Sequence, residues 1–127
     1  MSRVTERYLQ KAVHALRCLR RRRPLIHELT NFVSMNDCAN ITLAVGAKPV
    51  MARALPEVAE TAAAADSLLL NLGTLQESTV QSMHAAAAAA VRKGIPVVLD
   101  PVGAGGTAWR TETALALVRT YPFAAIR

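Results

Sequence analysis

Apolar positions along the chain alternate between two spacings, which divide it into helices and strands. Residues 4–22 repeat apolar side chains at helical spacing with arginine and lysine between them, which predicts an amphipathic helix that Pro24 ends. Gly46 and Gly94 are expected to cap two later helices. Residues 25–30 are expected to be a short link. The remaining pattern predicts helices over 33–45, 57–65, 76–93 and 111–119, and strands over 48–52, 67–72, 95–100 and 123–126.

The predicted strands are continuous apolar runs, which indicates that both faces of their sheet are covered. Short strands joined by helices predict parallel pairing with right-handed connections. The pattern therefore predicts an α/β fold, a layered parallel sheet with helices on both faces. No linker or repeat divides the chain. The last strand has no helix after it, so residues 1–127 are expected to be the N-terminal portion of a single, incomplete domain.

The composition supports a folded domain with an aliphatic core. The chain has 127 residues, of which 52% are hydrophobic, 19% charged and only 4% aromatic. Its longest apolar run, Ala85 to Val91, is far too short to cross a membrane. The two cysteines make neither a disulfide framework nor a zinc site. We expect a cytoplasmic protein with no membrane partner.

Positive charge gathers at the N-terminal end. Residues 1–23 hold eight bases and one acid, whereas the rest of the chain holds seven bases and eight acids. The run Arg20–Arg23 could bind nucleic acid or anionic lipid, or it could be a solvated helix end whose cations complement the helix dipole. No aromatic residues for base stacking are interleaved with the arginines, which favours the helix end. Salt-dependent retention on DNA or heparin would favour the nucleic-acid alternative.

Open parallel sheets bind ligands beyond the carboxyl ends of their strands. Asp100 ends an apolar strand and precedes the glycine-rich stretch Gly103–Gly106. A carboxylate there can hold a divalent metal or orient a hydroxyl, and glycines let a backbone approach an anion. Equally, the aspartate could cap a turn in which the glycines supply positive φ. The pattern alone leaves these alternatives open.

The other strand ends are less distinctive. The stretch Asn71–Thr74 offers polar groups, although Thr74 could also cap the next helix in a capping box with Glu77. Asn31 is a candidate N-cap. A methionine at a strand end, such as Met51, is more often core packing than a ligand contact. His27 is more typical of a hydrogen-bonded core residue than of a catalytic base.

Six stretches of the chain form an ordered set of motifs: Pro24–Asn40, Gly46–Ala52, Leu70–Leu75, Val98–Thr107, Arg110–Ala114 and Ala124–Arg127. Together they resemble the hydroxyethylthiazole kinase family, from about Leu16 to the last residue. That family has a ribokinase-like α/β fold and phosphorylates 4-methyl-5-(2-hydroxyethyl)thiazole with MgATP in thiamine salvage. It forms homotrimers with active sites between subunits.

The resemblance implies roles for matching positions. Arg127 would contact the ATP phosphates, and Asp100 would lie near Mg²⁺. The residues that would line the thiazole pocket are Met51, Asn31, Val33, Gly73 and Thr74. The family's anion hole and catalytic residue belong to a C-terminal half that these residues do not include, so residues 1–127 alone are expected to be inactive. The alternative is a non-catalytic ligand-binding or scaffolding fragment of the same fold.

Overall fold

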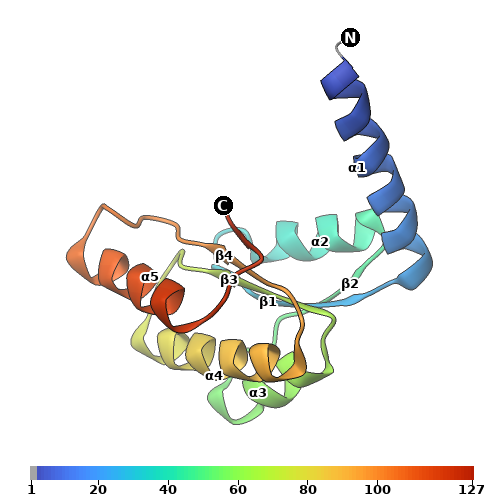
Figure 1. The fold of residues 1–127 in the computed structure, drawn as a ribbon. Helices are drawn as coiled ribbons and strands as arrows, with labels where there is room; N and C mark the ends of the chain where they lie inside the picture. Colours follow the sequence, from blue (N-terminus) through green and yellow to red (C-terminus); the bar gives the residue numbers. More distant parts are fainter. Residues whose placement is uncertain (1–2) are drawn as a thin grey trace.

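The structure is a computed structural model that describes residues 3–127. Five strands form one sheet in the order β2-β1-β3-β4-β5, and every neighbouring pair is parallel. The predicted α/β class is therefore confirmed (Figure 1). The helices are α1 (Arg3–Arg22), α2 (Met35–Val45), α3 (Leu55–Ala64), α4 (Glu77–Lys93) and α5 (Ala108–Thr120). The strands are β1 (Leu25–Leu29), β2 (Lys48–Val50), β3 (Ser67–Asn71), β4 (Val97–Asp100) and β5 (Ala125–Ile126).

The main error of the sequence prediction concerns β1. The expected link over 25–30 is a strand that pairs with both β2 and β3 near the centre of the sheet. Two polar residues inside it, His27 and Glu28, broke the apolar run that would have revealed it. Both are buried and hydrogen-bonded: His27 Nε2 donates to the Ala52 carbonyl (2.6 Å), and Glu28 Oε1 accepts from the Thr42 hydroxyl (2.6 Å). Each side chain therefore has one partnered polar atom, while His27 Nδ1 and Glu28 Oε2 are buried without a partner among the described residues.

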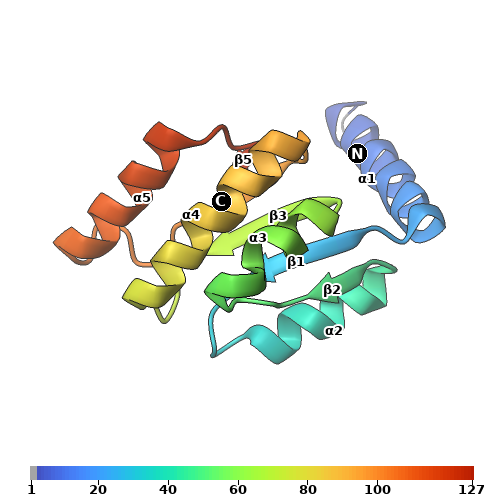
Figure 2. The same cartoon turned by 90° about the horizontal axis from the view of Figure 1, so that it is seen from below.

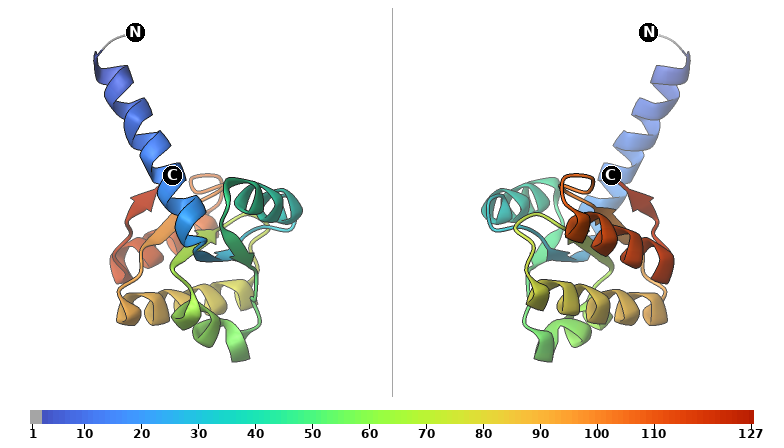
Figure 3. Two further views of the ribbon diagram at one scale, coloured as in Figure 1. Left: turned by 90° about the vertical axis from the view of Figure 1, so that its right-hand side faces the viewer. Right: turned by 90° about the vertical axis from the view of Figure 1, so that its left-hand side faces the viewer.

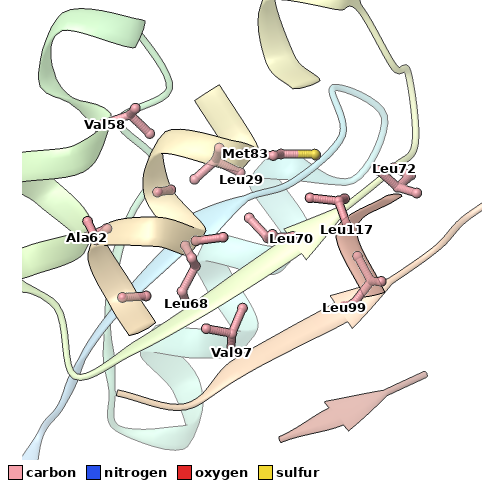
Figure 4. Close-up of a cluster of buried hydrophobic side chains, with 14 of the residues drawn as sticks. Leu29, Val58, Ala62, Leu68, Leu70, Leu72, Met83, Val97, Leu99 and Leu117 are labelled. Atoms are coloured by element: carbon pink, nitrogen blue, oxygen red, sulfur yellow. The ribbon is translucent and has the colours of Figure 1, made fainter. Parts of the chain in front are cut away.

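The hydrophobic core lies between the sheet and the layer of α3, α4 and α5 (Figures 2 and 4). In β3, Leu68 and Leu70 are buried while Leu69 on the opposite face is only half-buried. Alanines of α4 let this helix pack closely on the sheet and on α3, and Figure 4 shows Met83 among the strand leucines. Packing against these helices holds the strands in place, and with them the loops at the strand ends that carry the polar residues described below.

Coverage of the second sheet face is uneven. Helix α2 lies over that face beside β2, whereas α1 projects away from the body (Figures 1 and 3). Apolar side chains of α1 such as Tyr8 therefore remain exposed. Arg20, Arg21, Arg22 and Arg23 are exposed too, and both alternatives for this run, a helix end in solvent and an anion-binding surface, require that exposure. Among residues 3–127, no helix combines the length and hydropathy needed to cross a bilayer.

Helix ends agree with the glycine signals. Gly46 and Gly94 follow α2 and α4 in the left-handed conformation, with φ of 104° and 78°. The capping box predicted at Thr74 is wrong, because α4 begins at Glu77 after Gln76. Thr74 instead has a φ of 43° and uses its hydroxyl elsewhere, in the candidate site.

Candidate functional site

Polar side chains gather at the carboxyl edge of the sheet. Asn31 follows β1, Asn71 ends β3, Asp100 ends β4 and Arg127 follows β5. The strands are parallel, so these ends lie along one edge, and the register sets Asn71 directly beside Asp100. This is the edge at which open α/β sheets bind ligands.

Hydrogen bonds join these four side chains into one array, here called the edge network. Asn31 Nδ2 donates to Asn71 Oδ1 (3.1 Å), and Asn71 Nδ2 donates to Asp100 Oδ2 (2.8 Å). Arg127 Nη1 donates to the same Asp100 oxygen at 2.8 Å and forms an ion pair with it. The Asp100 side chain is 15% exposed and that of Arg127 is 80% exposed, so the pair faces solvent at the arginine end. Four strands are thereby coupled at one edge.

The loop after β1 is organised by Asn31. Its Oδ1 accepts from the backbone N–H groups of Val33 and Ser34, each at 3.0 Å, so the side chain caps the turn that precedes α2. The Phe32 N–H donates to the Thr74 hydroxyl at 3.1 Å, which ties this loop to the one after β3. Val33 itself is 85% exposed. The structure therefore brings Asn31, Val33 and Thr74 together.

Gly73 lies against Asn31 so closely that no larger residue fits. A Cβ at position 73 would lie 2.7 Å from Asn31 Cβ and 2.9 Å from its Nδ2. The Gly73 N–H donates to Asn71 Oδ1 at 2.8 Å, which fixes the turn at the end of β3. Glycine is thus required here by close approach, and the structure joins Gly73 to the edge network.

Met51 is half-buried and directly follows β2. It lies outside the hydrophobic core that the described residues form. The core-packing interpretation of Met51 therefore finds no support. The structure does not identify a ligand for the Met51 side chain either.

The glycine-rich loop after β4 has the hydrogen-bonding pattern of a turn. The N–H groups of Val102, Ala104 and Gly106 donate to carbonyls within the loop, and the Gly105 N–H donates to the Thr111 hydroxyl. These groups are therefore already bonded and do not form an open cradle for an anion, which favours the turn alternative for the glycines. The Thr107 hydroxyl accepts from the Arg110 N–H and caps α5.

Magnesium ligation by the described residues would rest on Asp100. No group of three or more His, Cys, Asp or Glu side chains gathers in the part of the chain that the structure describes. Magnesium is commonly held by one or two carboxylates together with substrate phosphates and water. Asp100, at the carboxyl edge of the sheet beside Arg127, could supply one such carboxylate.

Burial shifts the pKa values of two side chains of β1 in the directions expected for desolvation. Burial lowers the pKa of His27, which keeps the imidazole neutral; Nε2 donates to Ala52, and Nδ1 is buried without a partner. Burial likewise raises the pKa of Glu28, against the smaller opposing effect of the Thr42 hydrogen bond. Neither group reaches the edge network by a hydrogen bond, so both are core residues.

Glu28→Gln is expected to stabilise the chain at pH 7.5 but not at pH 4. Because folding raises the pKa of Glu28, its ionisation lowers the free energy of unfolding as pH rises through the folded-state pKa. Below the unfolded-state pKa, Glu28 is protonated in both states and this loss is absent. Glutamine keeps the oxygen that accepts from Thr42 and carries no charge. The gain should appear as a higher Tm for Glu28→Gln than for the unchanged chain at pH 7.5, with no difference at pH 4. Thermal unfolding at both pH values measures it; an equal shift at both, or a loss at pH 7.5, would contradict it.

Comparison with known proteins places the chain in a family. The model of the hydroxyethylthiazole kinase family matches residues 16–127. The chain belongs to the hydroxyethylthiazole kinase family. Its relatives include hydroxyethylthiazole kinases from Rubrobacter xylanophilus, 60% identical over 82% of the chain, and from Methanocorpusculum labreanum, 47% identical over 94% of the chain. The resemblance found in the sequence is confirmed.

A solved structure shares the fold. The hydroxyethylthiazole kinase protein from Pyrococcus horikoshii OT3 superimposes with a TM-score of 0.81 and 48% identity, covering 84% of this chain and 42% of that one. The chain likewise covers 39% of the Rubrobacter protein and 45% of the Methanocorpusculum protein. It therefore spans less than half the length of the hydroxyethylthiazole kinases that it matches.

Sequence reasoning found most of the members of this site but missed the residues that connect them. Asn71 is a polar strand end with no role in the sequence prediction, although it joins Asn31 to Asp100. The rule that picked out Asp100, a polar residue ending an apolar strand, also applies to Asn71. Arg110 was missed as well: its Nη1 donates to the carbonyls of Leu72 and Val102 and holds two edge loops together. No sequence signal identifies a helix arginine for that task.

Proposed function

We propose that the carboxyl edge of this sheet is the alcohol-binding and phosphate-facing part of a hydroxyethylthiazole kinase, which phosphorylates 4-methyl-5-(2-hydroxyethyl)thiazole with MgATP in thiamine salvage. The observation that carries the proposal is the edge network in a chain of this family. It couples the loop expected to hold the thiazole to the residues expected to face the phosphates. Catalysis of phosphoryl transfer depends mainly on such positioning and on charge neutralisation.

The proposed roles follow the geometry. Asn31 and Val33 would line the thiazole side together with Gly73 and Thr74, because these loops are bonded to one another. Met51, at the end of β2, would contact the ring. When bound, Mg²⁺ would neutralise charge on the phosphates, and Asp100 would be one of its ligands. Arg127 would contact the ATP phosphates, since its exposed guanidinium already lies against Asp100.

Further properties are proposed from family membership. We propose that residues 1–127 are the N-terminal portion of one ribokinase-like domain, and that the complete protein is a cytoplasmic homotrimer. The rival proposal, a non-catalytic ligand-binding or scaffolding fragment, predicts that the site binds a ligand without supporting turnover in any longer chain.

The test is a fused kinase. In it, residues 1–127 are followed by the C-terminal part of the Rubrobacter xylanophilus protein that lies beyond the region matched to this chain. ADP release should require the thiazole alcohol and reach within about tenfold of the Rubrobacter enzyme. The control substrate is 4,5-dimethylthiazole, which lacks the hydroxyl. A folded fused kinase without alcohol-dependent ADP release would favour the scaffolding alternative.

Met51→Lys in the fused kinase is expected to raise the KM for the thiazole alcohol at least tenfold and to change kcat much less. The ammonium group would lose hydration when the ring binds against it. Met51→Leu serves as the matched control and should raise KM less than about threefold. Steady-state kinetics and circular dichroism measure the two effects. Unfolding of Met51→Lys, or an unchanged KM, would instead support a packing role.

A further inference from the structure

Arg53 connects two loops at the carboxyl edge of the sheet. It lies two residues after Met51, in the loop between β2 and α3. Its Nη2 donates to the Thr30 carbonyl at 2.5 Å, in the loop after β1. Its guanidinium carbon lies 4.3 Å from the centre of the Phe32 ring, which is cation–π geometry. One side chain thus holds both the backbone and an aromatic ring of the neighbouring loop.

These two loops are the ones proposed to hold the thiazole ring. The loop after β2 begins with Met51, and the loop after β1 carries Asn31 and Val33. The loop after β1 is tied to β3 through Asn71 and Thr74. Among the side-chain interactions of residues 3–127, Arg53 supplies the tie from this loop to the loop after β2. The β1–β2 pairing and the His27–Ala52 hydrogen bond hold the start of the loop after β2 on β1. Arg53 adds the tie from that loop to the loop that carries Asn31 and Val33.

Stability alone does not account for an arginine at this place. Nη1 is buried and has no hydrogen-bond partner among the described residues. The one ion pair of residues 3–127 is that of Asp100 and Arg127, so no carboxylate neutralises Arg53. Burial also lowers the pKa of Arg53, because desolvation disfavours the charged guanidinium. An apolar side chain of similar length would fill the space without these costs.

We infer that Arg53 is a positioning residue, which sets the spacing between Met51 and the Asn31–Val33 loop and so shapes the thiazole pocket. The inference rests on the proposed function for its ligand, but the geometry it describes belongs to the free chain. A guanidinium suits the task because its planar fork donates to a carbonyl while its face lies on an aromatic ring. Lysine has a compact ammonium and reproduces only part of that arrangement.

Three variants of residues 1–127 test the inference. Arg53→Met keeps the apolar stem and removes the guanidinium, while Arg53→Lys keeps the charge. Arg92→Met is the matched control, because Arg92 is exposed in the last turn of α4, away from the site. Two quantities are measured: amide hydrogen exchange at Phe32, Val33 and Ser34, and the Kd for the thiazole alcohol by isothermal titration.

Arg53→Met should speed exchange at these amides at least tenfold, leave core amides of β3 and β4 unchanged, and weaken binding at least tenfold. Arg53→Lys should lie between Arg53→Met and the unchanged chain, and Arg92→Met should match the unchanged chain. Equal exchange in the loop for Arg53→Met would overturn the inference, whether or not the alcohol binds. If the unchanged chain does not bind the alcohol, that result counts against the proposed thiazole pocket in residues 1–127. Loop exchange still decides the role of Arg53.

A fourth variant, Phe32→Leu, covers the case in which Arg53→Met does not fold. Phe32→Leu removes the aromatic face and leaves the Thr30 carbonyl contact in place. Relative to the unchanged chain, it should speed exchange at Val33 and Ser34 by about threefold to tenfold, with core amides unchanged. Exchange in the loop that is unaffected by Phe32→Leu would contradict the proposed cooperation of ring and guanidinium.

Discussion

Asp100→Asn in the fused kinase is expected to lower kcat by about 100-fold or more while the KM for the thiazole alcohol changes less than about threefold. The carboxylate of Asp100 accepts from Asn71 and pairs with Arg127 through one oxygen. An amide there removes the negative charge that would hold Mg²⁺ and align Arg127 with the phosphates. The loss should therefore fall on phosphoryl transfer and not on ring binding. Steady-state kinetics with both substrates varied measures it.

The matched control is Asp66→Asn, at the opposite end of the sheet. Asp66 accepts a hydrogen bond from the Leu25 N–H at 2.7 Å, so this change also removes a hydrogen-bonded carboxylate. It should alter stability slightly and kcat not at all. Near-normal kcat for Asp100→Asn would return Asp100 to turn capping. An equal loss in both variants would show that the effect is a general one on folding.

Residues 1–127 alone are expected to show no thiazole-alcohol kinase activity, at least 1,000-fold below the fused kinase. Deprotonating the alcohol needs a base beside the reacting oxygen, and stabilising the transferred phosphoryl group needs several donors converging on it. In the described residues, the edge network offers Asp100 and Arg127 for these tasks, and His27 is buried in the core. Positioning and preorganised charge can each lower the activation free energy by several kcal/mol, so their absence would slow the reaction by orders of magnitude.

ADP release from the purified chain with MgATP, with and without the alcohol, measures this prediction. Circular dichroism must first show a folded chain, so that inactivity reflects the site. Turnover within tenfold of the fused kinase would contradict the prediction and show that the edge network suffices for catalysis.

The fold was predictable wherever local signals agreed with burial. The helices before Gly46 and Gly94 end at those glycines because the chain takes positive φ there. Strand β1 was not predictable from its pattern, because His27 and Glu28 find partners, Ala52 and Thr42, that only the folded chain brings near. The apolar pattern alone therefore predicts a loop for a central strand that contains two buried polar residues.

The site was predictable in position and not in connection. The strand-end rule located four places, Met51–Arg53, Asn71–Thr74, Asp100–Gly106 and Arg127, and the resemblance added Asn31 and Val33. The bonds that join them link residues 27 to 42 positions apart, which no local pattern records. The glycine-rich loop shows the converse: its glycines suggested an anion cradle, but the N–H groups described above are bonded within the loop and to Thr111.

The most direct test of the account is a ¹H–¹⁵N spectrum of residues 1–127 titrated with 4-methyl-5-(2-hydroxyethyl)thiazole. The account predicts saturable shifts of the Val33, Gly73 and Thr74 amides, together with the backbone around Met51, and none at the opposite edge near Asp66. Shifts confined to another surface, or no saturable shift from a folded chain, would contradict the claim that this sheet edge holds the thiazole.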